Sequence, residues 1–322
     1  MSRYRAVQAG AKLPSQALAA APRALTPLAL VAAALALVVP SAAVAHRADL
    51  LLALLVLATA LGIPAAELVA LRRRAGTVAL LSLAPLIVLG AVAWLLGHLF
   101  ATPERDGLLA VGFASSEVAS VGLVALAGGD AAAALGIVTA SLVLSALLGP
   151  VALEALGTGA GAGAGHGGTG HLLARFALVV IAPLIAGVAI RTAAPRALHR
   201  IDGEREGIAA LTVAALVYAA LSGASGTHGL GAALEASLLF LAVSAALGEL
   251  WRRRAPAASA IPGALTIAMR DFAVAAALAS QAFGTRAAAV PGVYGVVMLL
   301  AGSAAAGSLA RHRPAEATAG DR

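Results

Sequence analysis

Ten apolar runs, each long enough to cross a lipid bilayer as a helix, occupy most of this chain of 322 residues. A helix needs about 20 mainly apolar residues to span the hydrocarbon core. Inside lipid, the backbone polar groups must be satisfied within the protein, and helices do this segment by segment. We therefore predict an all-α integral membrane fold. The ten predicted spans are 25–45, 50–70, 77–100, 107–127, 131–153, 172–191, 207–226, 230–251, 257–283 and 287–309.

The composition supports a membrane protein and excludes several other classes. Charged residues make up 11% of the chain and the mean hydropathy is +0.95, whereas about a quarter of a soluble domain is charged. The chain has no Cys, which excludes disulfides, a thiol nucleophile and a zinc-thiolate site. Its net charge of +7 does not indicate a nucleic-acid partner, because the basic residues lie in short tracts between apolar runs. The expected partner is the lipid bilayer, and no cofactor is expected.

The distribution of Lys and Arg predicts the orientation. With a cytoplasmic N-terminus, 17 of the 22 basic residues fall in cytoplasmic segments and 4 in outer loops, with Arg270 inside a span. Cytoplasmic loops of membrane proteins carry an excess of Lys and Arg. We therefore expect an even number of spans with both termini in the cytoplasm.

The first span has an alternative interpretation. Its basic tail, apolar core and small-residue ending Ala43-Val44-Ala45 also describe a secretory signal peptide. We favour a retained anchor, because the run is nearly of full spanning length. Cleavage would leave nine spans.

A Gly-rich segment divides the chain into two halves. Residues 157–171 are predicted to be a flexible outer linker between a first repeat at 25–156 and a second at 172–309, with cytoplasmic tails at 1–24 and 310–322. Each half holds five spans, so the second half must be inserted upside down relative to the first. Inverted repeats of this kind are typical of secondary transporters.

Three charged residues lie within apolar spans. Glu117 is alone in Leu108–Ala127, and Arg270 and Asp271 are neighbours in Gly263–Phe283. Such charges would cost several kcal/mol each if they faced lipid. They should therefore face a polar interior, which favours a transport pathway. The alternative is that Arg270 only pairs with one of the two carboxylates as a structural contact.

The same two spans, the fourth of each half, contain residues that weaken a helix. Gly112, Ser115 and Ser116 precede Glu117, while Pro262-Gly263 and Thr266 precede Arg270. We predict that both helices are broken, near 115–117 and near 266–271. The freed amides and helix N-termini would attract an anion, and the freed carbonyls could hold a cation.

Several segments resemble the bile acid:sodium symporter family, in a bacterial form. In the first half they match that family's fourth and fifth spans, and in the second half its ninth and tenth. The matching segments are Ser116–Ser120, Leu126–Asp130, Leu144–Pro150, Ala268–Ala279 and Pro291–Gly295. The resemblance implies a panel domain and a core domain, in which the broken fourth and ninth helices cross. It also implies sodium-driven transport of organic anions, such as steroid acids and carboxylates, across the cytoplasmic (inner) membrane.

The sequence departs from that family at the sodium site. Members that bind sodium carry a Glu followed four residues later by Gln-Asn in the ninth span, and here those positions are Thr266, Arg270 and Asp271. In the fourth span, the family's Ser-Asn pair corresponds either to Ser116-Glu117 or to Ser120-Val121. Neither alignment restores the sodium ligands, although Glu117 and Asp271 could rebuild a sodium site.

We therefore expect a secondary transporter of a small organic anion, coupled to sodium or protons. Arg270, Ser115, Ser116 and Thr266 are the candidate substrate-binding residues. Glu117, Asp271 and Ser120 are the candidates for the coupling ion. The alternative is an oxyanion or arsenite permease of the related superfamily, which the absence of Cys disfavours. A membrane enzyme is not expected, because no plausible Ser-His-Asp, paired-carboxylate or HExxH site is present in the spans.

Overall fold

The computed structural model describes residues 13–63, 75–157, 168–223 and 229–311. Within these ranges the secondary structure is helical, apart from one isolated bridge. The first half contains α2 (Leu13–Val38), α3 (Ala42–Ala45), α4 (Ala48–Ala60), α6 (Ala75–Gly97), α7 (Thr102–Phe113), α8 (Ala119–Ala127) and α9 (Ala131–Leu156). The second half contains α10 (Gly168–Phe176), the π-helical η2 (Ala177–Ile181), α11 (Ala182–Ala193), α12 (Pro195–His199), α13 (Asp202–Gly223), α14 (Leu230–Arg254), α15 (Ala257–Ala268), α16 (Phe272–Phe283), the 3-10 turn η3 (Thr285–Ala288) and α17 (Ala289–Arg311).

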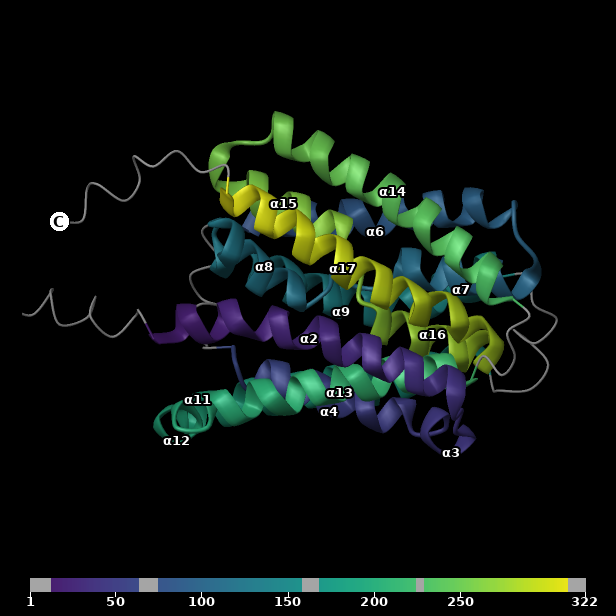
Figure 1. Cartoon of the computed structure of the whole chain (residues 1–322), viewed down its shortest axis with the longest axis horizontal. Helices are drawn as coiled ribbons and strands as arrows, with labels where there is room; N and C mark the ends of the chain where they lie inside the picture. The colour runs from purple at the N-terminus through teal and green to yellow at the C-terminus, as the bar shows by residue number, and fades with distance from the viewer. Residues whose placement is uncertain (1–12, 64–74, 158–167, 224–228, 312–322) are drawn as a thin grey trace, which may run out of the picture.

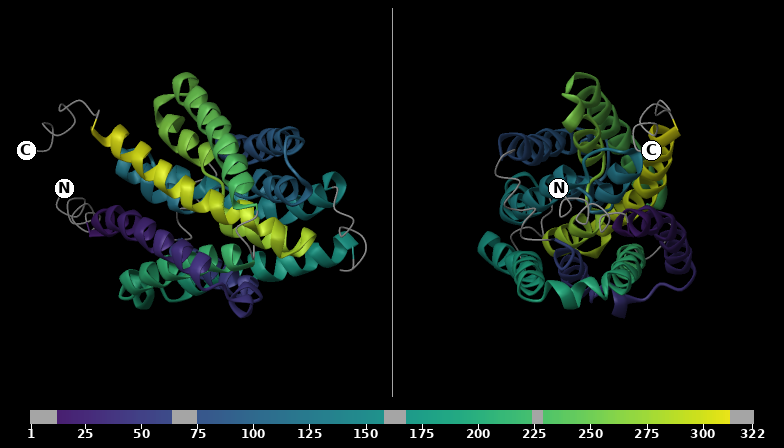
Figure 2. Two further views of the ribbon diagram at one scale, coloured as in Figure 1. Left: turned by 45° about the vertical axis from the view of Figure 1, so that its right-hand side comes forward. Right: turned by 90° about the vertical axis from the view of Figure 1, so that its left-hand side faces the viewer.

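The helices form two bundles that lie side by side (Figures 1 and 2). The first, here called the panel bundle, contains α2 to α4 and α10 to α13. The second, the core bundle, contains α6 to α9 and α14 to α17. Each bundle therefore takes helices from both halves of the chain, so the halves are interleaved in space.

Six helical segments among the described residues are long and apolar enough to cross a membrane. They are Ala75–Gly97, Ala131–Leu156, Gly170–Ala193, Glu204–Ser222, Leu230–Arg254 and Thr285–Arg311. Four shorter apolar helices overlap three of the other predicted spans, at Thr26–Val38, Ala48–Ala60, Ala257–Ala268 and Phe272–Phe283. The predicted span 107–127 is divided between α7 and α8, neither of which is among these candidates. This pattern supports a multi-pass membrane protein.

Helix boundaries differ from the predicted spans at the start of the chain. α2 begins at Leu13, inside the segment expected to be a tail, and ends at Val38 instead of continuing to residue 45. Pro40 explains the end, because the residue before a proline is disfavoured in the α conformation. In the second half, α10 begins at Gly168, within the predicted linker 157–171, and residues 158–167 lie outside the described ranges.

The second predicted span, 50–70, is also shorter than expected. α4 ends at Ala60, and residues 64–74 lie outside the described ranges. The Nη1 of Arg205, on α13, donates to the carbonyl of Ala58 at 3.0 Å. A cation is favourable at a helix C-terminus. Gly62 makes room for this guanidinium, since a Cβ there would lie 2.6 Å from Arg205 Nη1.

A polar contact joins the two bundles. Asp49, at the start of α4, accepts from Arg175 of α10 through Oδ2, with Nη2 at 2.5 Å. Its other oxygen, Oδ1, accepts from Gln281 Nε2 at 2.8 Å. Gln281 belongs to α16, so one carboxylate connects two panel helices to the core bundle.

Close helix packing in the core bundle leads to a testable prediction on α14. An alanine Cβ at Gly248 would lie 2.5 Å from the Ala264 carbonyl oxygen of α15, so one of the two helices would have to shift. Such overpacking costs about 1–3 kcal/mol. We expect Gly248→Ala to lower the thermal unfolding midpoint of the detergent-solubilised protein.

Gly231→Ala is the matched control on the same helix. Nothing lies within 4 Å of a Cβ at Gly231. Because alanine is a better helix former than glycine, this variant should be neutral or slightly more stable. Equal losses for both variants would contradict the packing argument.

Candidate functional site

The two predicted helix breaks are present, and their backbones pair with each other. α7 ends at Phe113 and α8 begins at Ala119, while α15 ends at Ala268 and α16 begins at Phe272. Ser116 and Arg270 form an antiparallel bridge. Its two hydrogen bonds run from Glu117 N to Met269 O at 3.0 Å and from Asp271 N to Ser115 O at 2.8 Å. Each break thus satisfies backbone groups that the other break leaves free.

Side chains from flanking helices satisfy further backbone groups at these breaks. The amide of Ser116 donates to Ser141 Oγ of α9 at 2.8 Å, and the amide of Arg270 donates to Tyr294 Oη of α17 at 3.1 Å. The Phe113 carbonyl accepts from Ser145 Oγ at 2.8 Å, and the Ala268 carbonyl from Ser244 Oγ at 3.1 Å. At each break, therefore, one hydroxyl group accepts from a backbone amide and another donates to a backbone carbonyl.

These supporting residues were not identified from the sequence. Ser141 and Ser145 are four residues apart, which places both hydroxyls on one face of a mainly apolar helix. Small polar residues on one face of a membrane helix indicate a contact with another helix. That spacing is the signal that could have identified them.

Both carboxylates accept from backbone amides at the start of the second helix of each broken pair, Asp271 as the N-cap of α16 and Glu117 from the position before the N-cap of α8. Glu117 Oε1 accepts from the amide of Ala119 at 3.2 Å, at the start of α8. Asp271 Oδ1 accepts from the amides of Ala273 and Val274 at 3.0 and 2.9 Å, at the start of α16. A negative charge is favourable at a helix N-terminus. Glu117 and Asp271 thus occupy corresponding positions in the two halves, but Glu117 Oε2 is buried and has no hydrogen-bond partner among the described residues.

Arg270 is completely buried at the bridge, yet it is not in an ion pair. Its exposed fraction is 0%, and no carboxylate oxygen of the described residues lies within 4.0 Å of its guanidinium. Nη2 donates to the carbonyl of Ala114, at the end of α7. Nε and Nη1 have no partner among the described residues. The structural alternative, in which Arg270 pairs with Glu117 or Asp271, is therefore not seen.

The remaining candidate residues are buried in the same region but differ in their bonding. The hydroxyls of Ser115 and Ser116 have no partner among the described residues. Ser120 Oγ donates to the Glu117 carbonyl at 2.6 Å. Thr266 Oγ1 donates to the carbonyls of Pro262 and Gly263, so its proton stays within α15. The breaks thus leave donors of Arg270, Ser115 and Ser116 available, together with one oxygen of Glu117.

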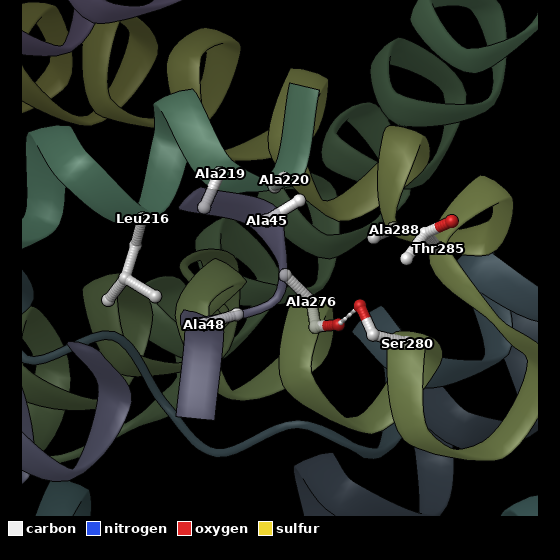
Figure 3. A pocket seen from close by; sticks show the side chains of 9 residues that line it. All are labelled: Ala45, Ala48, Leu216, Ala219, Ala220, Ala276, Ser280, Thr285 and Ala288. Carbon is white, nitrogen blue, oxygen red and sulfur yellow. Dashed lines mark hydrogen bonds between the residues drawn. The ribbon is translucent and has the colours of Figure 1, made fainter. Parts of the chain in front are cut away.

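The candidate site is buried inside the protein. Ser115, Ser116, Glu117, Arg270 and Asp271 are all buried, and none of them lines either of the two cavities described in the molecule. One cavity lies between the bundles, near Ala276 and Ser280 of α16 and Ala219 of α13 (Figure 3). Its volume is about 10 Å³, close to the minimum needed for one water. An organic anion could reach the breaks only after the surrounding helices move.

The support of the breaks can be tested at Ser141. Ser141→Ala would leave the buried amide of Ser116 without its acceptor, which costs about 1–3 kcal/mol. We expect a lower thermal unfolding midpoint in detergent. The control is Ser280→Ala, because Ser280 Oγ donates within α16, to the Ala276 carbonyl. If Ser280→Ala were equally destabilising, the contribution of Ser141 to the break would be refuted.

Comparison with known proteins gives a family for nearly the whole chain. The model of the SBF-like CPA transporter family matches residues 7–300, which include both breaks and all seven candidate residues. A comparison with curated proteins found no match.

Proposed function

The chain belongs to the SBF-like CPA transporter family, which is related to the bile acid:sodium symporters, and we propose that it is a secondary active transporter for a small organic anion. Family membership indicates a membrane transporter. The proposal adds the substrate class and the coupling, by sodium or protons. It also adds the location, the inner membrane of a bacterium.

One observation carries the proposed substrate class. Arg270 is a fully buried cation with no carboxylate partner and with two guanidinium nitrogens that make no hydrogen bond among the described residues. Leaving buried guanidinium donors without an acceptor is costly. A substrate carboxylate would accept a charge-assisted hydrogen bond from Nε or Nη1 of Arg270, neither of which has an acceptor among the described residues. The unpartnered hydroxyls of Ser115 and Ser116 would complete the recognition of the anion.

We assign the coupling ion to Glu117, with Asp271 and Ser120 nearby. Asp271 Oδ1 is already committed to two amides, whereas Glu117 has one oxygen without a partner. A proton on that oxygen, or a sodium ion held there with hydroxyl and carbonyl oxygens of the breaks, would neutralise it. Among the described residues, no group of three His, Cys, Asp or Glu could hold a metal ion, so a sodium site would depend on such neutral oxygens.

For the topology, we propose ten spans in two inverted five-helix repeats with both termini in the cytoplasm. The matched positions of the two breaks in the two halves support this, as does the bias of Lys and Arg. Alternating access would then need movement of the core bundle relative to the panel bundle, since the breaks are enclosed.

The experiment that tests the function is counterflow in proteoliposomes. The purified protein is loaded with one member of a panel of organic anions and challenged with labelled substrates, with and without a sodium or proton gradient. We expect at least one carboxylate to exchange, and one of the two gradients to drive its accumulation. Exchange of arsenite or another inorganic oxyanion, with no response to any carboxylate, would replace the proposal by the permease alternative.

Topology is tested separately by cysteine labelling. Because the chain has no Cys, single cysteines at Gly165 and Ala315 give an unambiguous signal, although both lie outside the described residues. An impermeant thiol reagent should label position 165 only from outside and position 315 only from inside. Labelling of position 165 only from inside would exclude the proposed orientation.

A further inference from the structure

A second cavity, away from the breaks, lies on the other side of the core bundle. It is formed by α6, α14 and α15, which lie close together in the upper part of Figure 1. Its volume is about 340 Å³, more than twice the roughly 150 Å³ that accommodates a benzene molecule in an engineered cavity. None of the seven candidate residues lines it, so substrate recognition does not account for it.

The cavity is an apolar groove with a buried floor and exposed edges. Leu81, Leu89 and Ile267 form the floor and are all buried. The edges are exposed, with Leu80 at 52% and Leu250 at 43%. Between Leu80 and Leu89, α6 advances by about 14 Å, at the usual rise of 1.5 Å per residue. The groove therefore has the dimensions for part of one extended acyl chain.

A free cation lies at one end of the groove. Three arginines end α14, and Glu249 engages two of them: Arg252 Nε lies 2.5 Å from Oε2 and Arg253 Nε lies 2.7 Å from Oε1. Arg254 lines the cavity and makes no hydrogen bond or ion pair with any residue that the structure describes. An apolar groove with a single unpaired cation at its end is complementary to an amphipathic anion.

The wall beside Arg254 is held in place. Trp251 Nε1 donates to the Ser259 carbonyl at 3.0 Å, and its ring packs against Gly263, where a Cβ would lie only 2.2 Å from Nε1. Tryptophan is enriched at membrane–water interfaces, where its ring and its N–H meet different environments. Trp251 and Arg254 thus place this end of the groove at the headgroup level.

We propose that this groove binds an anionic phospholipid, with one acyl chain between α6 and α14 and the phosphate on Arg254. In the orientation proposed above, Arg254 is at the cytoplasmic surface, and that leaflet carries anionic lipid. The bilayer supplies this ligand directly to a groove that opens at its edges. Ile267 lies on α15, three residues before Arg270. The bound acyl chain would contact Ile267, and therefore one of the two helices that meet at the second break.

The chain offers a built-in reporter for this site. It has two tryptophans, so Trp94→Phe leaves Trp251 as the single tryptophan, which can be excited selectively. The full-length variant is reconstituted in phosphatidylcholine vesicles that contain a fixed fraction of phospholipid brominated on one acyl chain. We expect brominated phosphatidylglycerol to quench Trp251 with roughly five-fold higher affinity than brominated phosphatidylcholine, the factor that corresponds to one interfacial cation.

Two matched variants distinguish lipid binding at Arg254 from a general effect of surface charge. Arg254→Gln should remove the preference for phosphatidylglycerol, whereas Arg253→Gln, which lowers the net charge equally, should keep it because Arg253 is already paired with Glu249. Ala84→Phe, which fills the groove from α6, should weaken quenching by both lipids.

Three outcomes would overturn the proposal. Equal quenching of the parent protein by the two brominated lipids would show that the groove does not prefer anionic lipid. If Arg253→Gln lost the preference to the same extent as Arg254→Gln, the preference would be explained by surface charge in general and not by the groove. Stronger quenching by brominated dodecanoate than by brominated phosphatidylglycerol would make the groove a site for single-chain acids.

Discussion

Replacing Arg270 by Gln together with Asp271 by Asn should reduce carboxylate uptake at least ten-fold while the protein still folds. A hydrogen bond to a charged group contributes about 1.5–3 kcal/mol, which corresponds to roughly 10-fold to 150-fold in binding. The fold should survive because Asn keeps the acceptor that caps α16, and because the introduced glutamine side chain can still donate a hydrogen bond. Uptake is measured in proteoliposomes, and folding by the thermal unfolding midpoint.

The matched control is Arg286→Gln, which removes a positive charge from an exposed residue of η3. Its uptake should equal that of the parent protein. The structural alternative, in which the neighbouring charges only stabilise each other, predicts the reverse for the double variant. Uptake at the parent rate, with unchanged dependence on sodium and pH, would therefore refute the assignment of Arg270.

Glu117→Gln should abolish the stimulation of uptake by a sodium or proton gradient but leave substrate exchange intact. Glutamine can keep the hydrogen bond to the Ala119 amide while losing the titratable oxygen. The charges explain why coupling is needed here. Arg270, Glu117 and Asp271 sum to −1, so an anionic substrate adds to an excess of negative charge unless one acid takes a proton or a cation.

This prediction is checked by comparing gradient-driven uptake with counterflow for the same preparation. Glu235→Gln is the control, since Glu235 is exposed on α14 and far from the breaks along the chain. Gradient-driven uptake that survives in Glu117→Gln would place the coupling ion on another residue. Loss of both activities would show that Glu117 serves substrate binding and not coupling alone.

The positions of the breaks could be predicted from the sequence because charge and weak helix formers coincide there. In the first half, Ser115 and Ser116 lie in the gap between α7 and α8, as expected. In the second half, Pro262 and Gly263 were expected to weaken the helix, yet both lie inside α15 and do not interrupt it. The interruption is at Met269–Asp271, where Asp271 caps the next helix and the partner break supplies hydrogen bonds.

What the sequence could not reveal is contact between distant segments. Nothing in the local pattern around Arg270 indicates that its amide would meet Tyr294 Oη, or that its guanidinium would form no ion pair within 4.0 Å among the described residues. The end of α4 is a similar case, because Arg205 of α13 stabilises it from 147 residues away. Hydropathy predicts that a run is helical, whereas the end of a helix can depend on a side chain from elsewhere.

If the core bundle moves relative to the panel bundle, as we propose, the contact of Asp49 with Gln281 would bias the equilibrium between open and closed arrangements. Gln281 Nε2 lies 2.8 Å from Asp49 Oδ1, and a hydrogen bond is lost once the atoms separate beyond about 3.5 Å. Movement of α16 away from α4 by about an ångström would therefore break it. The pairing of Asp49 with Arg175 lies within the panel bundle and would persist.

One amide–carboxylate hydrogen bond contributes about 1.5–3 kcal/mol, so it favours the closed arrangement by roughly 10-fold to 150-fold. A ligand shifts such an equilibrium only by its difference in affinity for the two states, and a bias of this size is within the reach of a single bound anion. The open arrangement would then be a minor population before substrate arrives and a major one afterwards.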